Sequence, residues 1–303
     1  MTAPTPLEPA PETLVGGRRV LLKREDVHEL GAFKWRGALP VLEQYRARGV
    51  EAIVTASTGN HGVATAWAAR RLGLVAIVFV PLEASQTKVD RLRQLDADLR
   101  LVGADLDEAK DAARAVAESN DLPFFEDGAE PAQLTGYEAI GEEILEQLAE
   151  TPRAVVVPVG NGALLGGIGR ALARRSQDAL RIGVVAKEAP AMAESWEAGK
   201  PVGSARCETF ADGLAVRVAI PLAVATLNEV ADRILRVSER SIAHAVSAYA
   251  EAGIRAEGAA AAALAALEQL EDVDDPIVLV VTGRNIDDAV LARCREHPES
   301  FAE

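Results

Sequence analysis

Residues 154–167, AVVVPVGNGALLGG, carry the clearest indication of the fold in this sequence. The first six residues are apolar, and the glycine-rich part opens an amphipathic segment that continues to about Arg175. This pattern predicts a strand buried on both faces, a tight turn and a helix. Glycines let backbone N–H groups approach a phosphate closely, so the turn is a candidate phosphate loop, with a plain strand–helix turn as the alternative. It matches neither the usual dinucleotide fingerprint nor a nucleotide-triphosphate loop.

The same alternation of short apolar runs and amphipathic segments extends along the chain in both directions. Apolar runs predict strands at 51–56, 75–81, 99–102, 154–159, 181–185 and 276–281. Apolar residues three or four apart predict helices at 60–72, 86–95, 105–120, 139–149, 221–229, 239–252 and 257–270. The longest expected loop is FEDGAEPAQLTG, at about 125–136. Such a chain forms an α/β fold whose parallel sheets are covered by helices, here in two series.

Composition excludes several classes of protein. The chain has 303 residues, 49% of them hydrophobic and 26% charged, which is enough for two domains. Its net charge of −14 and the lack of a long basic run argue against a nucleic-acid partner. No apolar stretch approaches the ~20 residues of a membrane span, and the proline-rich N-terminus does not resemble a signal peptide. We therefore expect a cytoplasmic protein, with Cys207 and Cys294 as free thiols.

Two further strand–turn–helix junctions resemble the first. Residues 57–62 (STGNHG) follow the strand at 51–56, and residues 282–285 (TGRN) follow the strand at 276–281. Ligands of parallel sheets bind at the carboxyl ends of strands, where helix N-termini present backbone amides. Residues 57–62 therefore form either a pocket for an anion or carboxylate, or an ordinary helix cap. Arg284 lies either at a ligand rim or on the surface.

Lys34 is a candidate reactive amine. It stands between Phe33 and Trp35, with Gly31 and Gly37 on either side. Burial by aromatic neighbours lowers the pKa of a lysine, and such a lysine can form a Schiff base. A surface lysine is the alternative for a single residue of this type.

Six motifs, in order along the chain, together resemble the fold-type II family of pyridoxal-phosphate enzymes, in its threonine/serine dehydratase (serine racemase-like) branch. They are LKREDVHELGAFKWRGA (22–38), ASTGNHG (56–62), VVVPVGNGALLGG (155–167), FADGLAV (210–216), EGAAAAALAAL (257–267) and VVTGRNID (280–287). The resemblance implies an α/β fold of the tryptophan-synthase-β-like type. Residues 1–36 and 145–303 would form a large cofactor-binding domain and residues 37–144 a small mobile one, with the cofactor between them. It also implies a homodimer and a small amino-acid substrate.

The resemblance implies a role for each matching residue. Lys34 would hold pyridoxal 5'-phosphate as a Schiff base and remove the α-proton, and Thr282 would face the pyridine nitrogen. The other cofactor-binding residues would be Asn60 at the phenolic oxygen, Gly160, Asn161, Gly162, Ala163 and Leu164 at the phosphate, and Glu257 near the ring edge. Ser57, Thr58 and His61 would hold the substrate carboxylate, helped by the helix dipole.

The implied reaction is β-elimination of a small hydroxy amino acid such as threonine, serine or 3-hydroxyaspartate, giving a keto acid and ammonia. A neutral hydroxyl beside the ring nitrogen favours loss of a β-substituent. Thr58 stands where serine racemases of the family carry a catalytic serine, and its bulk disfavours racemisation. Other departures are Leu30, Ala32, Asn161, Ala163 and Arg284, where the family usually has threonine, serine or glycine. The departures at Asn161, Ala163 and Arg284 bear on the identity of the substrate more than on cofactor binding.

Two further hypotheses accompany this one. The spacing of Glu188, Met192 and Glu194 matches a Mg²⁺ or Ca²⁺ site of the branch, made of two carboxylates and a backbone carbonyl, although an acidic loop is the alternative. The rival functions are a β-replacement synthase or racemase of the same fold, and a nucleotide-binding regulatory protein without chemistry. Against a synthase stands His61, since synthases usually place threonine or alanine after the asparagine.

Overall fold

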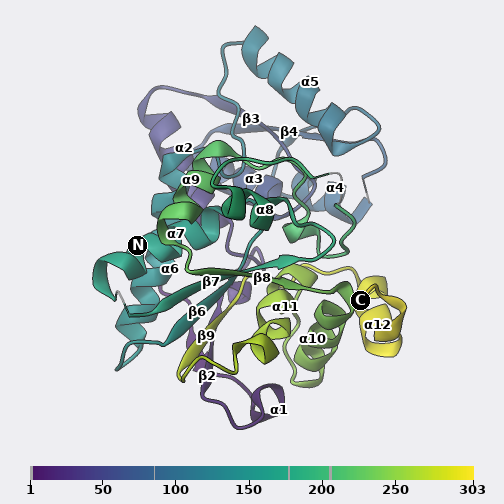
Figure 1. Ribbon diagram of the computed structural model, residues 1–303. Helices are drawn as coiled ribbons and strands as arrows, with labels where there is room; N and C mark the ends of the chain where they lie inside the picture. The colour runs from purple at the N-terminus through teal and green to yellow at the C-terminus, as the bar shows by residue number, and fades with distance from the viewer. Residues whose placement is uncertain (1–2, 85, 177, 205–206) are drawn as a thin grey trace. The chain divides into compact units, whose positions relative to one another are not determined.

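The chain forms two compact units. The computed structural model describes residues 3–84, 86–176, 178–204 and 207–303. The large unit contains Met1–Phe33 and Tyr137–Glu303, and the small unit contains Lys34–Gly136. The boundaries fall after residues 33 and 136, whereas the predicted ones fall after 36 and 144. Each unit is built around its own sheet (Figure 1).

The large unit is built on a six-stranded sheet. Its order is β1-β2-β9-β6-β7-β8, and only β1 pairs antiparallel. The central strands β6 and β9 are buried at every position, because helices cover the sheet on both faces. The strands are β1 (Leu7–Pro9), β2 (Val20–Arg24), β6 (Ala154–Pro158), β7 (Leu180–Ala186), β8 (Arg233–Val237) and β9 (Ile277–Val281).

Helices of the large unit pack against this sheet in two groups. Alternate residues of its strands, such as Val156 and Leu279, join α10 and α11 in one apolar core. Helix α7 contacts β6 and β7 and packs with α9 (Figure 1). The helices are α1 (Glu12–Val15), α7 (Ala163–Arg175), α8 (Ala191–Ala198), α9 (Pro221–Val230), α10 (Glu239–Glu251), α11 (Gly258–Ala265) and α12 (Asp288–Glu296). Helix α6 (Pro131–Gln147) begins in the small unit and ends in the large one.

The small unit has a three-stranded parallel sheet in the order β3-β4-β5. Alanines of α5 pack on Val54, Ile77 and Phe79, which forms the apolar core on one face. Residues 123–125 run beside β3, since Val54 exchanges backbone hydrogen bonds with Pro123 and Phe125. The elements are α2 (Trp35–Ala47), β3 (Ala52–Ala56), α3 (Asn60–Leu72), β4 (Val75–Val80), α4 (Gln86–Arg93), β5 (Asp98–Leu101) and α5 (Leu106–Ser119).

The predicted α/β fold with parallel sheets is confirmed, but some predicted elements are wrong. The expected loop at 125–136 is helical from Pro131 onward, because Pro131 is tolerated in the first helical turn and the rest of α6 packs in the core. The helix expected at 257–270 ends at Ala265 and continues as a 3₁₀ turn, Leu267–Leu270. In the described ranges, no helix combines the length and apolarity needed to cross a membrane.

Candidate active site

The loop between β6 and α7 has glycine at two positions where another residue would clash or adopt a strained φ angle. A Cβ at Gly160 would lie 2.2 Å from the Gly213 carbonyl oxygen. Gly162 has a φ of 92°, in the left-handed region, and directly precedes α7. The side-chain oxygen of Asn161 accepts a hydrogen bond from the Ala163 backbone N–H at 3.0 Å. The predicted residues 160–164 thus lie together at a helix N-terminus whose first amides lack helical partners.

Thr282 and Glu257 lie together at the carboxyl end of β9. Glu257 donates its backbone N–H to the Gly283 carbonyl, and a Cβ at Gly283 would lie 2.5 Å from a Glu257 carboxylate oxygen. The Thr282 side chain is 2% exposed, and its hydroxyl has no hydrogen-bond partner among the residues described. A buried hydroxyl without a partner is costly, so this one is suited to a ligand that supplies a partner.

Residues 28–33, which lead to Lys34, are fastened to the end of β9. Phe33 donates its backbone N–H to the Thr282 carbonyl oxygen at 3.1 Å. Arg284 donates its backbone N–H to the Gly31 carbonyl oxygen at 2.9 Å, and the Asn285 side chain donates to the Leu30 carbonyl at 3.0 Å. The Arg284 guanidinium also donates to the His28 carbonyl oxygen at 3.4 Å, so the side chain that replaces a family glycine supports the loop that precedes the lysine.

The junction between β3 and α3 lies in the small unit. Ser57 accepts a hydrogen bond at its hydroxyl from the Gly59 N–H, at 3.2 Å, and Asn60 is the first residue of α3. A Cβ at Gly62 would lie 2.6 Å from the Ser57 carbonyl oxygen, so glycine is required there. Thr58 is half-buried between them. The predicted carboxylate-binding residues thus surround the positive end of a helix dipole.

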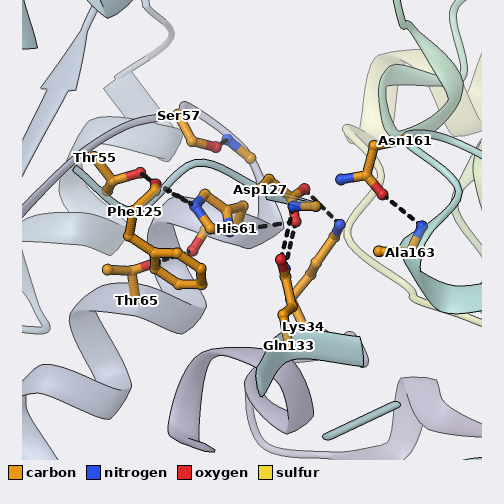
Figure 2. A network of polar contacts seen from close by, with 12 residues as sticks. Lys34, Thr55, Ser57, His61, Thr65, Phe125, Asp127, Gln133, Asn161 and Ala163 are labelled. Carbon is orange, nitrogen blue, oxygen red and sulfur yellow. Dashed lines mark hydrogen bonds and ion pairs between the residues drawn. The ribbon is translucent and has the colours of Figure 1, made fainter. Parts of the chain in front are cut away.

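Lys34 pairs with a carboxylate that the sequence motifs do not include. Its Nζ lies 2.6 Å from Oδ2 of Asp127. The other oxygen, Oδ1, accepts a hydrogen bond from the Gln133 side chain at 2.6 Å and lies 3.6 Å from Nδ1 of His61. Figure 2 shows Asp127 between these three side chains. All four residues belong to the small unit.

Electrostatics keep this carboxylate ionised. Burial alone would raise the pKa of Asp127, but the charge of Lys34, with His61 and the hydrogen bonds from Lys34 and Gln133, holds the pKa well below its usual range. His61 is different, because burial dominates and lowers its pKa despite the Asp127 charge. His61 Nε2 lies 3.1 Å from the Thr55 hydroxyl and 3.3 Å from the Phe125 carbonyl oxygen. The predicted contact of His61 with a substrate carboxylate stays a prediction.

The side chain of Lys34 is 16% exposed, so it is mostly buried. The aromatic residues on either side of it in the sequence pack on other rings, Phe33 on Tyr137 at 5.1 Å and Trp35 on Trp67 at 6.3 Å between ring centroids. The predicted effect of these neighbours on Lys34 stays a prediction. Asp127 belongs to none of the sequence motifs, so sequence reasoning misses it.

The predicted cation-binding residues follow β7. Glu188 lies in the turn after the strand, whereas Met192 and Glu194 lie in α8. A carbonyl in that helix accepts a bond from the amide four residues later, which competes with a metal ion. Within residues 3–84, 86–176, 178–204 and 207–303, no group of three or more His, Cys, Asp or Glu side chains is arranged to hold a metal. The cation site stays a prediction.

The glycine loop, the Thr282 hydroxyl that lacks a partner among the described residues and the lysine are each typical of a cofactor-dependent α/β enzyme. Comparison with known families gives the same class, since the family model described as pyridoxal-phosphate dependent enzyme matches residues 1–283. The chain belongs to this family.

Named relatives place it more closely. It is 34% identical over 285 residues to an L-threonine ammonia-lyase of Thermotoga maritima, covering 92% of this chain and 70% of the relative. It is 35% identical over 202 residues to a biosynthetic L-threonine dehydratase of Pasteurella multocida, covering 66% of this chain and 39% of that longer relative. The processed form of threonine deaminase isoform 2 from Solanum lycopersicum superposes with a TM-score of 0.91 at 31% identity, over 97% of this chain and 88% of that chain.

Proposed function

We propose that this chain is a pyridoxal-phosphate-dependent ammonia-lyase that removes the β-hydroxyl of a small hydroxy amino acid and releases a keto acid and ammonia. The observation that carries the proposal is Lys34, which lies in the family's lysine motif and is held by Asp127 at 2.6 Å. The named relatives act on threonine according to their names, and this substrate class is carried over here as part of the proposal.

The residues present fit the cofactor. Gly160 and Gly162 leave no room for a side chain, and the amides at the start of α7 suit a phosphate. The partnerless hydroxyl of Thr282 suits the pyridine nitrogen. When bound, pyridoxal phosphate withdraws the electron pair left at the substrate Cα after deprotonation.

The chain's own residues supply binding and proton transfer. Lys34 would hold the cofactor covalently and, as a free amine, remove the α-proton. Ser57, Thr58 and Asn60 lie at the start of α3, where the dipole would hold the substrate carboxylate and the Asn60 amide the phenolic oxygen. Glu257 would lie beside the ring edge.

The activity is tested by keto acid release. The purified holoenzyme is incubated with L-threonine, L-serine and 3-hydroxyaspartate, and the keto acid is measured. Release from at least one of them is expected, and no release from any hydroxy amino acid would overturn the proposal. Turnover that needs a second nucleophile would favour a β-replacement synthase instead. Formation of the D-amino acid as the main product would favour a racemase.

Three finer features belong to the same proposal: a homodimer, a cytoplasmic location and a small unit that moves on substrate binding. Light scattering on the purified holoenzyme tests the first, and a monomer would contradict it. The cation at Glu188 and Glu194 is tested by chelation. A melting temperature and a keto acid rate that are unchanged after chelator treatment would remove Mg²⁺ and Ca²⁺ from the proposal.

A further inference from the structure

Asp127 is the one strongly held carboxylate described around Lys34 that the proposed reaction has not used. Its Oδ2 lies 2.6 Å from Lys34 Nζ, while Oδ1 accepts the Gln133 amide at 2.6 Å. The side chain is 27% exposed, so a small molecule can reach it. A charge in this place acts directly on whatever binds beside the lysine.

The segment around Asp127 is fixed on both sides. Before it, Phe125 donates its backbone N–H to Val54 of β3, at 2.8 Å, and Glu126 pairs with Lys110 and Arg114 of α5. After it, the Gly128 N–H donates to the Gln133 side chain, at 2.7 Å.

A further anchor comes from helix α2. The Tyr45 hydroxyl donates to a Glu130 carboxylate oxygen at 2.6 Å, which ties the start of α6 to α2. A carboxylate held by contacts on several elements can rotate away from an unfavourable ligand only by breaking those contacts, which costs free energy. Asp127 therefore discriminates between ligands instead of adapting to them.

Its distance from the lysine places Asp127 near the substrate side chain. An amine that removes the α-proton must come within about 3 Å of it. Cβ is one bond further, so the carboxylate lies within roughly 7 Å of Cβ, where an unscreened charge still acts on a β-substituent. Lys34 works as a base only when it is neutral, and in that form it does not compensate the Asp127 charge.

We propose that Asp127 determines substrate specificity: its carboxylate accepts a hydrogen bond from a neutral β-substituent and repels acidic side chains. This rests on the proposed function, and it narrows the substrate class to uncharged hydroxy amino acids such as serine and threonine, against 3-hydroxyaspartate. Because the Asp127 side chain is partly exposed, solvent screens the repulsion, and discrimination of about tenfold is expected.

Binding of L-asparagine and L-aspartate to the holoenzyme tests the charge alone. The two ligands have nearly the same shape, and neither has a β-hydroxyl to lose. Calorimetry is expected to give a dissociation constant about tenfold larger for aspartate. Equal constants in the wild-type protein, or no binding of either ligand at millimolar concentration, would overturn the inference without any variant.

Two substitutions then locate the effect. In Asp127→Asn the ratio of the two constants is expected to fall to near one, and kcat/KM for 3-hydroxyaspartate relative to threonine is expected to rise about tenfold. Asp121→Asn is the matched control, since it removes the same charge from an exposed position in the same unit. It should keep the wild-type ratio. Asp127→Ser replaces Asp127→Asn if the latter does not fold.

Different results would overturn the specificity role of Asp127 and the ammonia-lyase activity. A wild-type protein that prefers asparagine about tenfold, loses this preference in Asp127→Asn and releases no keto acid would overturn the function but keep the inference. A protein that releases keto acid from serine or threonine, while Asp127→Asn keeps the wild-type ratio, would overturn the inference alone.

Discussion

Two lysine–carboxylate pairs of equal length lie in different surroundings in this molecule. Lys23 Nζ lies 2.6 Å from Oε2 of Glu143 in the large unit, and Lys34 Nζ lies 2.6 Å from Oδ2 of Asp127 in the small unit. The Lys23 side chain is fully buried, whereas the Lys34 side chain is 16% exposed. Lys23 also donates to the Thr5 carbonyl and to the Gln147 side chain.

The difference lies in what surrounds each ammonium. Three acceptors use the three N–H donors of Lys23, so its pair fastens the N-terminal segment and β2 to α6. Lys34 and its partner keep accessible surface, so a ligand can reach them. The two ion pairs therefore have the same length and differ in how accessible they are to a ligand.

The largest effect on either lysine pair should come from Lys34→Ala. We expect keto acid formation to fall about 10³-fold or more, because the variant loses both the covalent link to the cofactor and the proton acceptor. The visible absorbance of the lysine-linked cofactor should disappear as well. Full activity in this variant would refute the role of Lys34, and a circular dichroism spectrum like that of the wild type is the control for folding.

The sequence predicts the fold better than it predicts the two lysine–carboxylate pairs. The buried strands are continuous apolar runs, and β6 and β9 lie where those runs predict them. Strand β2 was not predicted, because its VLLKR ends in charged residues, and the burial of Lys23 depends on acceptors from distant segments. The edge strand β8, RILRV, was not predicted for the same reason, because its arginines interrupt the apolar run.

The residues of the candidate site likewise differ in how well the sequence predicts them. Lys34, the glycine loop and Thr282 are recognisable because local motifs carry them. Asp127 has no motif, and it pairs with a lysine 93 residues away only because residues 123–125 run beside β3. Contacts between distant segments depend on tertiary packing, which a single sequence does not display.

The second prediction concerns the structural pair. Glu143→Leu leaves the Lys23 ammonium buried without its counter-charge, and the free energy of unfolding should fall by about 3 kcal/mol or more. Urea denaturation measures this loss, and Glu146→Leu on the same helix, where the side chain is 66% exposed, is the control with little effect. If the loss matches that of the control, Lys23 does not depend on this carboxylate.

The buried carboxylate of Glu239 has no lysine in the pairs described and so shows what the lysines contribute. The residue is 4% exposed, one oxygen accepts the Phe210 N–H at 3.0 Å, and the other has no hydrogen-bond partner within the described chain. Burial raises the pKa of Glu239, and the charge of Glu188 adds to this. The native state therefore binds this proton more tightly than the unfolded state.

The raised pKa of Glu239 makes stability depend on pH. Above the unfolded pKa of about 4.3, the native state retains the proton that the unfolded state releases, so this residue's contribution to stability falls as pH rises through the raised native pKa. Glu239→Gln cannot titrate, and we expect it to be more stable than wild type at pH 7 by about 1 kcal/mol. Urea denaturation at pH 4 to 8 tests this, and a difference that does not change with pH would contradict the raised pKa.

The smallest effect on stability should come from Asp127→Asn, which compares the partner of Lys34 with the partner of Lys23. The Lys34 pair is partly exposed, so loss of its partner should lower the unfolding free energy by less than loss of Glu143 does, by about 1 kcal/mol. The same urea denaturation, run beside Glu143→Leu and Asp121→Asn, measures the cost. If Asp127→Asn destabilised the protein as much as Glu143→Leu, the Lys34 pair would be as structural as the Lys23 pair. A small cost together with the lost preference for asparagine over aspartate would mean that Asp127 is retained for what binds beside it and contributes little to folding.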